Sequence, residues 1–171
     1  MELNVTFETE RLFFRQYSMA DLPFLLTMTR DPDVMKFIGE GRALSEKETV
    51  EGLGRFIKSY EDKEHTGLLV AIEKESRSPI GHAGLIKQMI EGKQEIEIGY
   101  WLAKEYWGKG YATEAAVGCK EYGLSNLGKK RLVSIIQLEN HPSMNVARKN
   151  GMQFERTVSF REKEVALYSI G

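Results

Sequence analysis

Cysteine, histidine and proline are scarce in this sequence. Its 171 residues include one cysteine, three histidines and four prolines. The single cysteine, Cys119, excludes an internal disulfide, and so few cysteines and histidines argue against a structural zinc site. We therefore expect no bound metal. A chain of this length can build a hydrophobic core without such crosslinks.

An excess of either charge is also missing. Lysine and arginine total 24 against 25 for aspartate and glutamate. This balance argues against a nucleic-acid-coating protein, although a local basic pocket for a phosphate ligand stays compatible with it. Apolar runs fall far short of the roughly 20 residues that span a bilayer, and residues 1–5 lack the features of a secretory signal. We expect a cytoplasmic chain with one domain over residues 1–171 and no nucleic-acid or membrane partner.

The apolar residues change their spacing along the chain. Capping-box sequences at 18–21 and 45–48 each precede apolar residues at helical spacing, with turn residues at 31–33 and 39–41 between them. The strands predicted from alternation and turn residues are 68–73, 80–86, 95–102, 132–138, 153–160 and 165–170. Short turns between the first three imply an antiparallel meander. Further helices are predicted after Tyr111 and from Pro142 to about Asn150, so we expect an α/β (α+β) fold with about four helices.

Two glycines stand just before the third predicted helix. Gly108 and Gly110 let the backbone turn tightly, and the unpaired amides of a helix start suit a pyrophosphate. Lys109 adds a cation and Thr113 a hydroxyl. The pattern is neither a Walker A loop nor a Rossmann fingerprint, because Thr113 stands where the third glycine would fall. Taken alone, such a glycine pair is equally compatible with a plain tight turn.

The surroundings of the glycines carry a family resemblance. Residues 97–116, EIGYWLAKEYWGKGYATEAA, resemble the acetyl-CoA-binding core of the GNAT superfamily of N-acetyltransferases, and most of all its branch that acetylates ribosomal-protein amino termini. Residues 9–12 (TERL), Asn140-x-x-Ser143 and Lys149-x-Gly151 fit the same branch and extend the resemblance over nearly the whole chain. It implies a twisted, mostly antiparallel mixed sheet with splayed middle strands, and acetyl-CoA as co-substrate.

The resemblance also implies roles for single residues. The loop at 107–112 binds the pyrophosphate, the strand at 100–102 pairs with the pantetheine arm, and Ser143 lies near the sulfur. The implied cofactor-binding residues are Tyr100, Trp101, Leu102, Gly108, Lys109, Gly110, Tyr111, Ala112, Thr113, Asn140, Ser143 and Lys149, with Arg148 as an alternative to Lys149. For Asn140, helix capping stays open as the other role. Ala147 stands where many relatives have a catalytic tyrosine, which leaves Ser143 as the candidate acid.

Glu97 is the second candidate catalytic residue. An ammonium group has no lone pair, so an amine acceptor must lose a proton before it attacks. The resemblance puts a carboxylate at this position near the amine, where Glu97 acts as a general base, an electrostatic anchor or simply a solvated strand residue. Glu95 lies two residues away on the same strand face and could share the role.

Other functions and most of the acceptor's identity stay open. A non-catalytic acyl-CoA-binding module and a nucleotide-binding, kinase-like enzyme are the alternatives to an amine acetyltransferase. The acceptor is a small-molecule or peptide amine: a protein α-amine, a polyamine, an aminoglycoside-like drug or an amino acid. Glu40, Glu46 and Glu48 could attract a polyamine or a basic peptide. We expect specificity from the first two helices, the loop at 31–45 and the turn at 160–165, in a monomer or homodimer.

Overall fold

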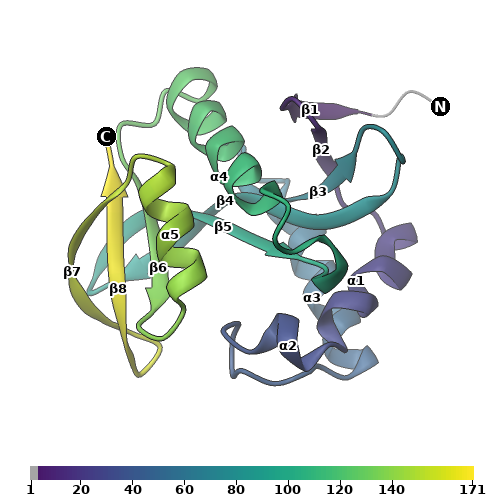
Figure 1. Ribbon diagram of the computed structural model, residues 1–171, viewed down its shortest axis with the longest axis horizontal. Helices are drawn as coiled ribbons and strands as arrows, with labels where there is room; N and C mark the ends of the chain where they lie inside the picture. The colour runs from purple at the N-terminus through teal and green to yellow at the C-terminus, as the bar shows by residue number, and fades with distance from the viewer. Residues whose placement is uncertain (1–3) are drawn as a thin grey trace.

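Eight strands form one sheet in the computed structural model, which describes residues 4–171 (Figure 1). Their order is β1-β2-β3-β4-β5-β6-β8-β7. The strands are β1 (Val5–Glu8), β2 (Leu12–Gln16), β3 (Gly67–Glu73), β4 (Pro79–Ile90), β5 (Lys93–Leu102), β6 (Leu132–Gln137), β7 (Gln153–Phe160) and β8 (Lys163–Ile170). Residues 1–3, which entered the signal-peptide expectation, lie outside the described residues.

Five α-helices accompany the sheet within residues 4–171. They are α1 (Leu22–Thr29), α2 (Pro32–Met35), α3 (Glu46–Ser59), α4 (Tyr111–Glu121) and α5 (His141–Lys149). In the part of the chain that the structure describes, every helix is too short or too polar to cross a membrane.

The two faces of the sheet carry separate cores. On one face, residues such as Phe14 and Leu69 pack with α4 and α5. Their neighbours in sequence, Phe13 and Val70, point to the opposite face and pack with α1 and α3. Because side chains alternate along a strand, β2 and β3 contribute to both layers at once.

Most of the predicted elements are confirmed. The capping box that starts α3 forms as expected, with the Ser45 hydroxyl accepting from the Glu48 amide at 3.1 Å and the Glu48 carboxylate accepting from the Ser45 amide at 3.0 Å. The meander over β3, β4 and β5 is antiparallel, and the mixed sheet is mostly so. These outcomes follow from local spacing and capping alone.

Several boundaries were wrong or missed. The strands β1 and β2 were not predicted, β4 continues from residue 86 to Ile90, and β8 begins at Lys163 rather than 165. The turn expected at 31–33 instead begins α2, a short helix that was not among the four predicted. Its start is favoured because the Asp31 side chain accepts from the Asp33 amide at 2.9 Å and Pro32 occupies the first helical turn.

The central strands β5 and β6 diverge, as the family resemblance implied. They run parallel and share a single paired position, Glu97 with Val133. By contrast, β5 pairs with β4 over its whole length, from Lys93 to Leu102. Beyond Glu97, one edge of β5 therefore faces a gap that widens toward α2, and Figure 1 shows the two strands separating there.

Candidate active site

The open edge of β5 offers backbone hydrogen-bonding groups to the gap. The Ala103 amide donates to the Ile80 carbonyl of the β4 side at 2.9 Å. Alternation along an antiparallel pair then directs the backbone groups of Ile98, Tyr100 and Leu102 toward the gap. The indole of Trp107 donates to the Leu102 carbonyl at 3.0 Å and occupies that acceptor. The paired position of Glu97 with Val133 already engages the Ile98 amide, so the backbone groups of Tyr100 remain for a ligand that binds as an added strand.

The glycine loop leads directly into α4. Gly108 and Gly110 have φ values of +75° and +83°, in the left-handed region that glycine adopts without strain. The Glu114 amide makes the first intrahelical bond, to the Gly110 carbonyl at 3.1 Å. The preceding amides of the helix start, through Thr113, thus lack intrahelical acceptors and can bind an anion. The Lys109 side chain is exposed and its ammonium lies 5.6 Å from the ring centre of Tyr106.

A clamp from the start of the chain holds this loop. The Glu114 carboxylate accepts from the Thr9 hydroxyl at 2.5 Å, the Arg11 amide at 2.8 Å and the Arg11 Nε at 2.7 Å. Arg11 Nη1 donates to the Lys109 carbonyl at 3.0 Å, and its guanidinium lies 4.1 Å from the ring centre of Tyr111. The family resemblance included residues 9–12 but gave them no role. In the structure, Thr9 and Arg11 bind Glu114, and Arg11 also binds the glycine loop at Lys109.

Two hydroxyl groups meet on the α5 side of the gap. Tyr100 Oη, from β5, lies 2.7 Å from Ser143 Oγ, in the first turn of α5. Burial raises the pKa of Tyr100, and the hydrogen bond to Ser143 opposes the shift. The side chain of Asn140 caps α5 by accepting from the Ser143 amide at 3.3 Å, so the capping role left open for Asn140 is the one observed. Ala147 is buried in the core.

Glu97 lies on the opposite face of β5 from Tyr100 because the two are three residues apart on one strand. Its side chain is half-buried, and Gln88 Nε2 donates to its carboxylate at 3.0 Å. Burial raises the pKa of Glu97 to about 7, against the lowering effects of the Gln88 hydrogen bond, the Arg161 charge and the Ile135 amide. A carboxyl group with this pKa exchanges its proton near neutral pH, which suits acid–base chemistry.

Glu95 does not share this environment. It is buried, and its carboxylate forms ion pairs with Arg131 Nε at 2.9 Å and Lys93 Nζ at 3.2 Å. Two cations therefore hold Glu95 in a structural contact. The expectation that it could share the role of Glu97 is not supported by this geometry.

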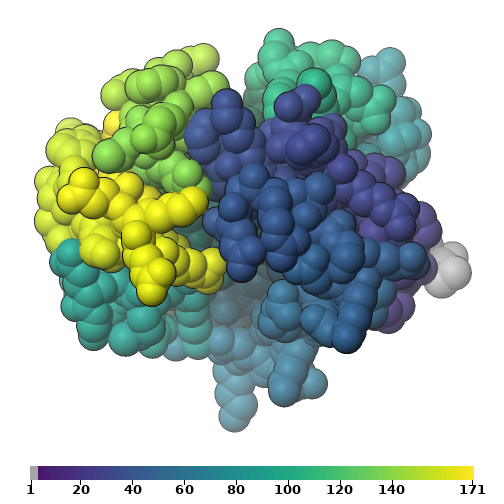
Figure 2. All heavy atoms as spheres, turned by 90° about the horizontal axis from the view of Figure 1, so that it is seen from below, coloured from purple at the N-terminus to yellow at the C-terminus, as the bar shows by residue number. Residues whose placement is uncertain are grey.

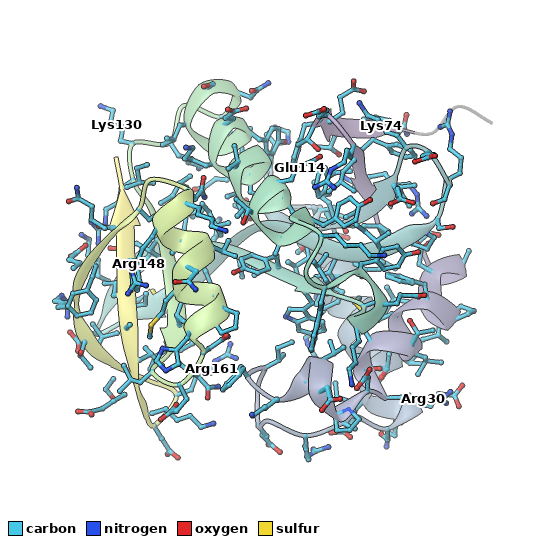
Figure 3. All side chains as sticks on the ribbon, viewed as in Figure 1. Arg30, Lys74, Glu114, Lys130, Arg148 and Arg161 are labelled. Carbon is cyan, nitrogen blue, oxygen red and sulfur yellow. The ribbon has the colours of Figure 1, made fainter. Side chains whose placement is uncertain are left out.

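The end of α5, which carries Arg148 and Lys149, packs against the middle of α4. Asn150, which ends α5, donates from Nδ2 to the Ala116 carbonyl at 3.1 Å, and Lys120 Nζ donates to the Asn150 carbonyl at 3.1 Å. These contacts place the end of α5 more than one helical turn beyond the start of α4. The Arg148 guanidinium donates to the Tyr168 hydroxyl at 3.2 Å, and Figure 3 shows it beside β8.

Two further reactive side chains, Cys119 and His82, lie in the core. Cys119 is fully buried, which raises its pKa to about 12 and agrees with its predicted core position. His82 is also buried, 2.6 Å from the Tyr17 hydroxyl through Nδ1, and burial lowers its pKa to about 3. Within residues 4–171, no cluster of three or more histidine, cysteine, aspartate or glutamate side chains could hold a metal ion.

The gap therefore combines four features. A helix start suited to phosphate stands near a free strand edge, a hydroxyl pair lies on one face, and a near-neutral carboxylate lies on the other. This arrangement suits group transfer from a phosphate-bearing, strand-like donor to a nucleophile that must lose a proton.

Known proteins are similar to this chain in sequence and in fold. A family model described as an acetyltransferase (GNAT) domain matches residues 11–153. The uncharacterized N-acetyltransferase YnaD of Bacillus subtilis (strain 168) is 33% identical over 86% of this chain and 82% of its own length. A GNAT-family acetyltransferase structure from Bacillus anthracis is 27% identical, with a TM-score of 0.78 over 95% of this chain and 94% of its own.

The ribosomal-protein branch appears among the solved structures. RimL, a ribosomal L7/L12 alpha-N-protein acetyltransferase solved in complex with coenzyme A, has a TM-score of 0.81 and covers 98% of this chain and 97% of its own. Its sequence is 16% identical, so this likeness shows the fold.

Proposed function

Because the chain belongs to the GNAT acetyltransferase family, we propose that it transfers the acetyl group of acetyl-CoA to a primary amine by direct attack. The observation that carries the proposal is the free edge of β5, with the Tyr100–Ser143 pair on one face and Glu97 on the other. Residues 1–171 act as one domain in this proposal, as a monomer or homodimer.

The donor side of the gap fits acetyl-CoA. The first amides of α4, with Gly108 and Gly110, bind the pyrophosphate, and the arginine clamp keeps the loop in shape. The amide-containing pantetheine arm pairs with the free backbone groups of Tyr100, at the edge of β5 beyond its one contact with β6. That arm leads the thioester to the Tyr100–Ser143 pair.

The acceptor side is the face of Glu97. Its carboxylate, with a pKa of about 7, takes a proton from the ammonium form of the acceptor. Proton loss is easier from an α-amine, with an ordinary pKa of about 8, than from a lysine side chain at about 10.4. The difference of more than two pKa units corresponds to about 3 kcal/mol in the free energy of deprotonation. Glu97 therefore supports a weakly basic amine as the acceptor.

The hydroxyl pair acts on the departing sulfur. As the carbon–sulfur bond breaks, its electron pair moves to sulfur, and a hydroxyl of the pair donates a hydrogen bond to the developing thiolate. An ordinary thiol has a pKa of about 8.5, below the ordinary value of about 10 for tyrosine. Burial raises the pKa of Tyr100 further. Stabilisation by hydrogen bonding is therefore favoured over complete proton transfer.

Replacing Tyr100 by phenylalanine is expected to lower kcat about tenfold, because one hydrogen bond worth about 1–1.5 kcal/mol is lost from the transition state. KM for acetyl-CoA should change less than about twofold. Ser143→Ala should lower kcat by a similar factor. The double variant should be about as slow as the slower single variant, because the two hydroxyl groups act as one unit. Steady-state rates of the three variants measure this. Unchanged kcat in both single variants would contradict the assignment.

The proposed function is tested by release of CoA from acetyl-CoA in the presence of different amines. The panel contains N-terminal peptides, amino acids, polyamines and aminoglycosides, with mass spectrometry of the products to identify the acetylated nitrogen. Amine-dependent release supports the proposal. Acetyl-CoA binding without turnover on any amine would favour a binding module, and absence of binding would refute the function altogether.

A further inference from the structure

The turn between β7 and β8 carries an arginine in an unusual backbone conformation. Phe160 pairs with Lys163, which leaves Arg161 and Glu162 as a two-residue turn. Their φ values are +49° and +66°, a combination for which asparagine and glycine are the favoured residues. Larger side chains are strained in this region, so the turn holds Arg161 at some cost in stability.

The packing of this turn places Arg161 on the face of Glu97. The ring of Phe160 packs against the cluster that contains Val133, the residue paired with Glu97 across β5 and β6. The Arg161 guanidinium lies 5.0 Å from the centre of the Phe160 ring. Figure 3 shows Arg161 between the foot of the β7–β8 hairpin and α2.

A second cation reaches this region from the other side. Lys36 follows α2, and its ammonium lies 5.2 Å from the ring centre of Phe37. The Phe37 carbonyl accepts from Gln137 Nε2 at 3.2 Å, which ties this segment to the end of β6. Figure 2 shows the same segment, in dark blue, beside the yellow C-terminal hairpin. Lys36 and Arg161 therefore flank the mouth of the gap.

These two charges are not balanced by ion pairs. Among residues 4–171, no carboxylate lies within 4.0 Å of the Lys36 ammonium or the Arg161 guanidinium. Glu164 is next to Val165, which packs in the cluster with Phe160, so Glu164 points to the opposite face of β8.

The three glutamates that could attract a polyamine, Glu40, Glu46 and Glu48, form ion pairs with arginines of this chain. Glu40 and Glu48 both bind Arg42, at 3.0 Å and 2.7 Å, and Glu46 lies 3.6 Å from Arg30. The acceptor side therefore presents Arg161 and Lys36 at its mouth and Glu97 farther along the sheet. Glu162 follows Arg161 in the turn, and Asp33, near Lys36, is paired with Lys104. A polycation is disfavoured there, and an amine that also carries an anion is favoured.

We propose that Arg161, assisted by Lys36, binds an anionic group of the acceptor, which is a small molecule that carries a carboxylate or phosphate in addition to its amine. This inference rests on the proposed function. A guanidinium binds either anion through two parallel hydrogen bonds, and the Phe160 ring limits the orientations that the guanidinium can take. Glu97 then meets the amine at the other end of the molecule.

The test compares acceptors that differ only in the anion. One pair is a dipeptide with a free carboxylate and the same dipeptide with a C-terminal amide, and the other is an aminoalkyl phosphate and the matching amino alcohol. We expect kcat/KM to be about tenfold or more higher for the anionic member, the factor given by one charge-assisted hydrogen-bonding contact. The pair with the larger ratio identifies carboxylate or phosphate as the preferred anion.

Variants connect this preference to Arg161. Arg161→Asn removes the charge and suits the left-handed turn, so folding is preserved. It should lower kcat/KM about tenfold for the anionic acceptor and less than twofold for the neutral one. Arg161→Lys should retain part of the preference, and Lys36→Gln should lose a smaller part. The matched control is Arg156→Gln, which removes a β7 arginine that pairs with Glu91 instead.

The outcomes separate this inference from the proposed function. Three results would overturn the inference alone. They are turnover with equal kcat/KM for both members of each pair, a preference for polyamines or peptides without regard to the anion, and an Arg161→Asn variant that keeps the wild-type preference. Calorimetric binding of the same pairs to the CoA-bound protein does not need turnover. Arg161-dependent binding of the anionic member without any acetylation would keep the inference and refute the proposed function.

Discussion

Replacing Glu97 by glutamine is expected to lower kcat/KM by about 10²–10⁴-fold, the range of a lost general base. Glutamine has nearly the same shape and can still accept the hydrogen bond that Gln88 donates at 3.0 Å, so the variant should fold normally. What it cannot do is take a proton from an ammonium group. Steady-state kinetics at saturating acetyl-CoA measure the loss.

The pH profile distinguishes a base from an electrostatic anchor. Glu97 must be ionised to accept a proton, and its pKa is raised to about 7 by burial. At saturating acceptor, the wild-type kcat should therefore rise with pH through about 7, and Glu97→Gln should lack this limb and rise only toward the higher pKa of the acceptor amine. A variant that keeps both the limb and most of the rate would show that another group removes the proton.

Stability should move in the opposite direction to activity. A carboxyl group whose pKa is higher in the folded than in the unfolded state stabilises the fold at low pH. This contribution is lost as the pH rises from about 4.5 to about 7. At pH 8 the fold holds a disfavoured charge that glutamine lacks, so Glu97→Gln should melt at the same or a higher temperature. By contrast, Glu95→Gln should lower Tm, because it removes the charge of a buried carboxylate that pairs with the partly exposed Arg131 and the exposed Lys93.

Replacing Gly110 by valine should raise KM for acetyl-CoA about 10–100-fold. Gly110 has a φ of +83°, where a β-branched residue costs about 1–3 kcal/mol. An added Cβ would also lie 3.3 Å from Arg11 Nη2, in the clamp that fixes the loop. The loop amides would then lose their arrangement around the pyrophosphate. Equilibrium binding of acetyl-CoA and KM from initial rates measure the change.

A matched glycine separates loop geometry from general strain. Gly92, in the turn between β4 and β5, has a φ of +81° and open space around the position of an added Cβ. Gly92→Val should lower Tm through similar backbone strain but leave KM for acetyl-CoA within about twofold of the wild type. If both variants weakened the binding of acetyl-CoA equally, the effect would come from lost stability, and the role of Gly110 in binding would be refuted.

Local signals were enough to predict most of the fold. The capping box at Ser45, the alternation of β3 and β5, and the turn at Glu91 and Gly92 each specify structure within a few residues. The strands β1 and β2 were missed because their burial depends on neighbours distant in sequence. The splay of β5 from β6 came from the family resemblance, since no spacing within either strand encodes it.

The candidate site was predictable only where one segment contains it. Gly108, Gly110 and Glu97 lie within a continuous motif, so sequence alone could point to them. The clamp joins Arg11 to Glu114, 103 residues later, and the hydroxyl pair joins Tyr100 to Ser143, 43 residues later. Such contacts depend on which elements the fold brings together. A family match at residues 9–12 marked Arg11 without giving its partner.

The single paired position between β5 and β6 also predicts where the sheet opens most easily. The strands β6, β8 and β7 are hydrogen-bonded to one another, and so are β1 to β5. Among residues 4–171, Glu97 with Val133 is the only paired position between these two sets of strands. Local opening along this line breaks few backbone bonds, whereas opening within either set breaks many. Amide hydrogen exchange should thus resolve two protected units of different stability. The boundary between these units is the gap that donor and acceptor must enter.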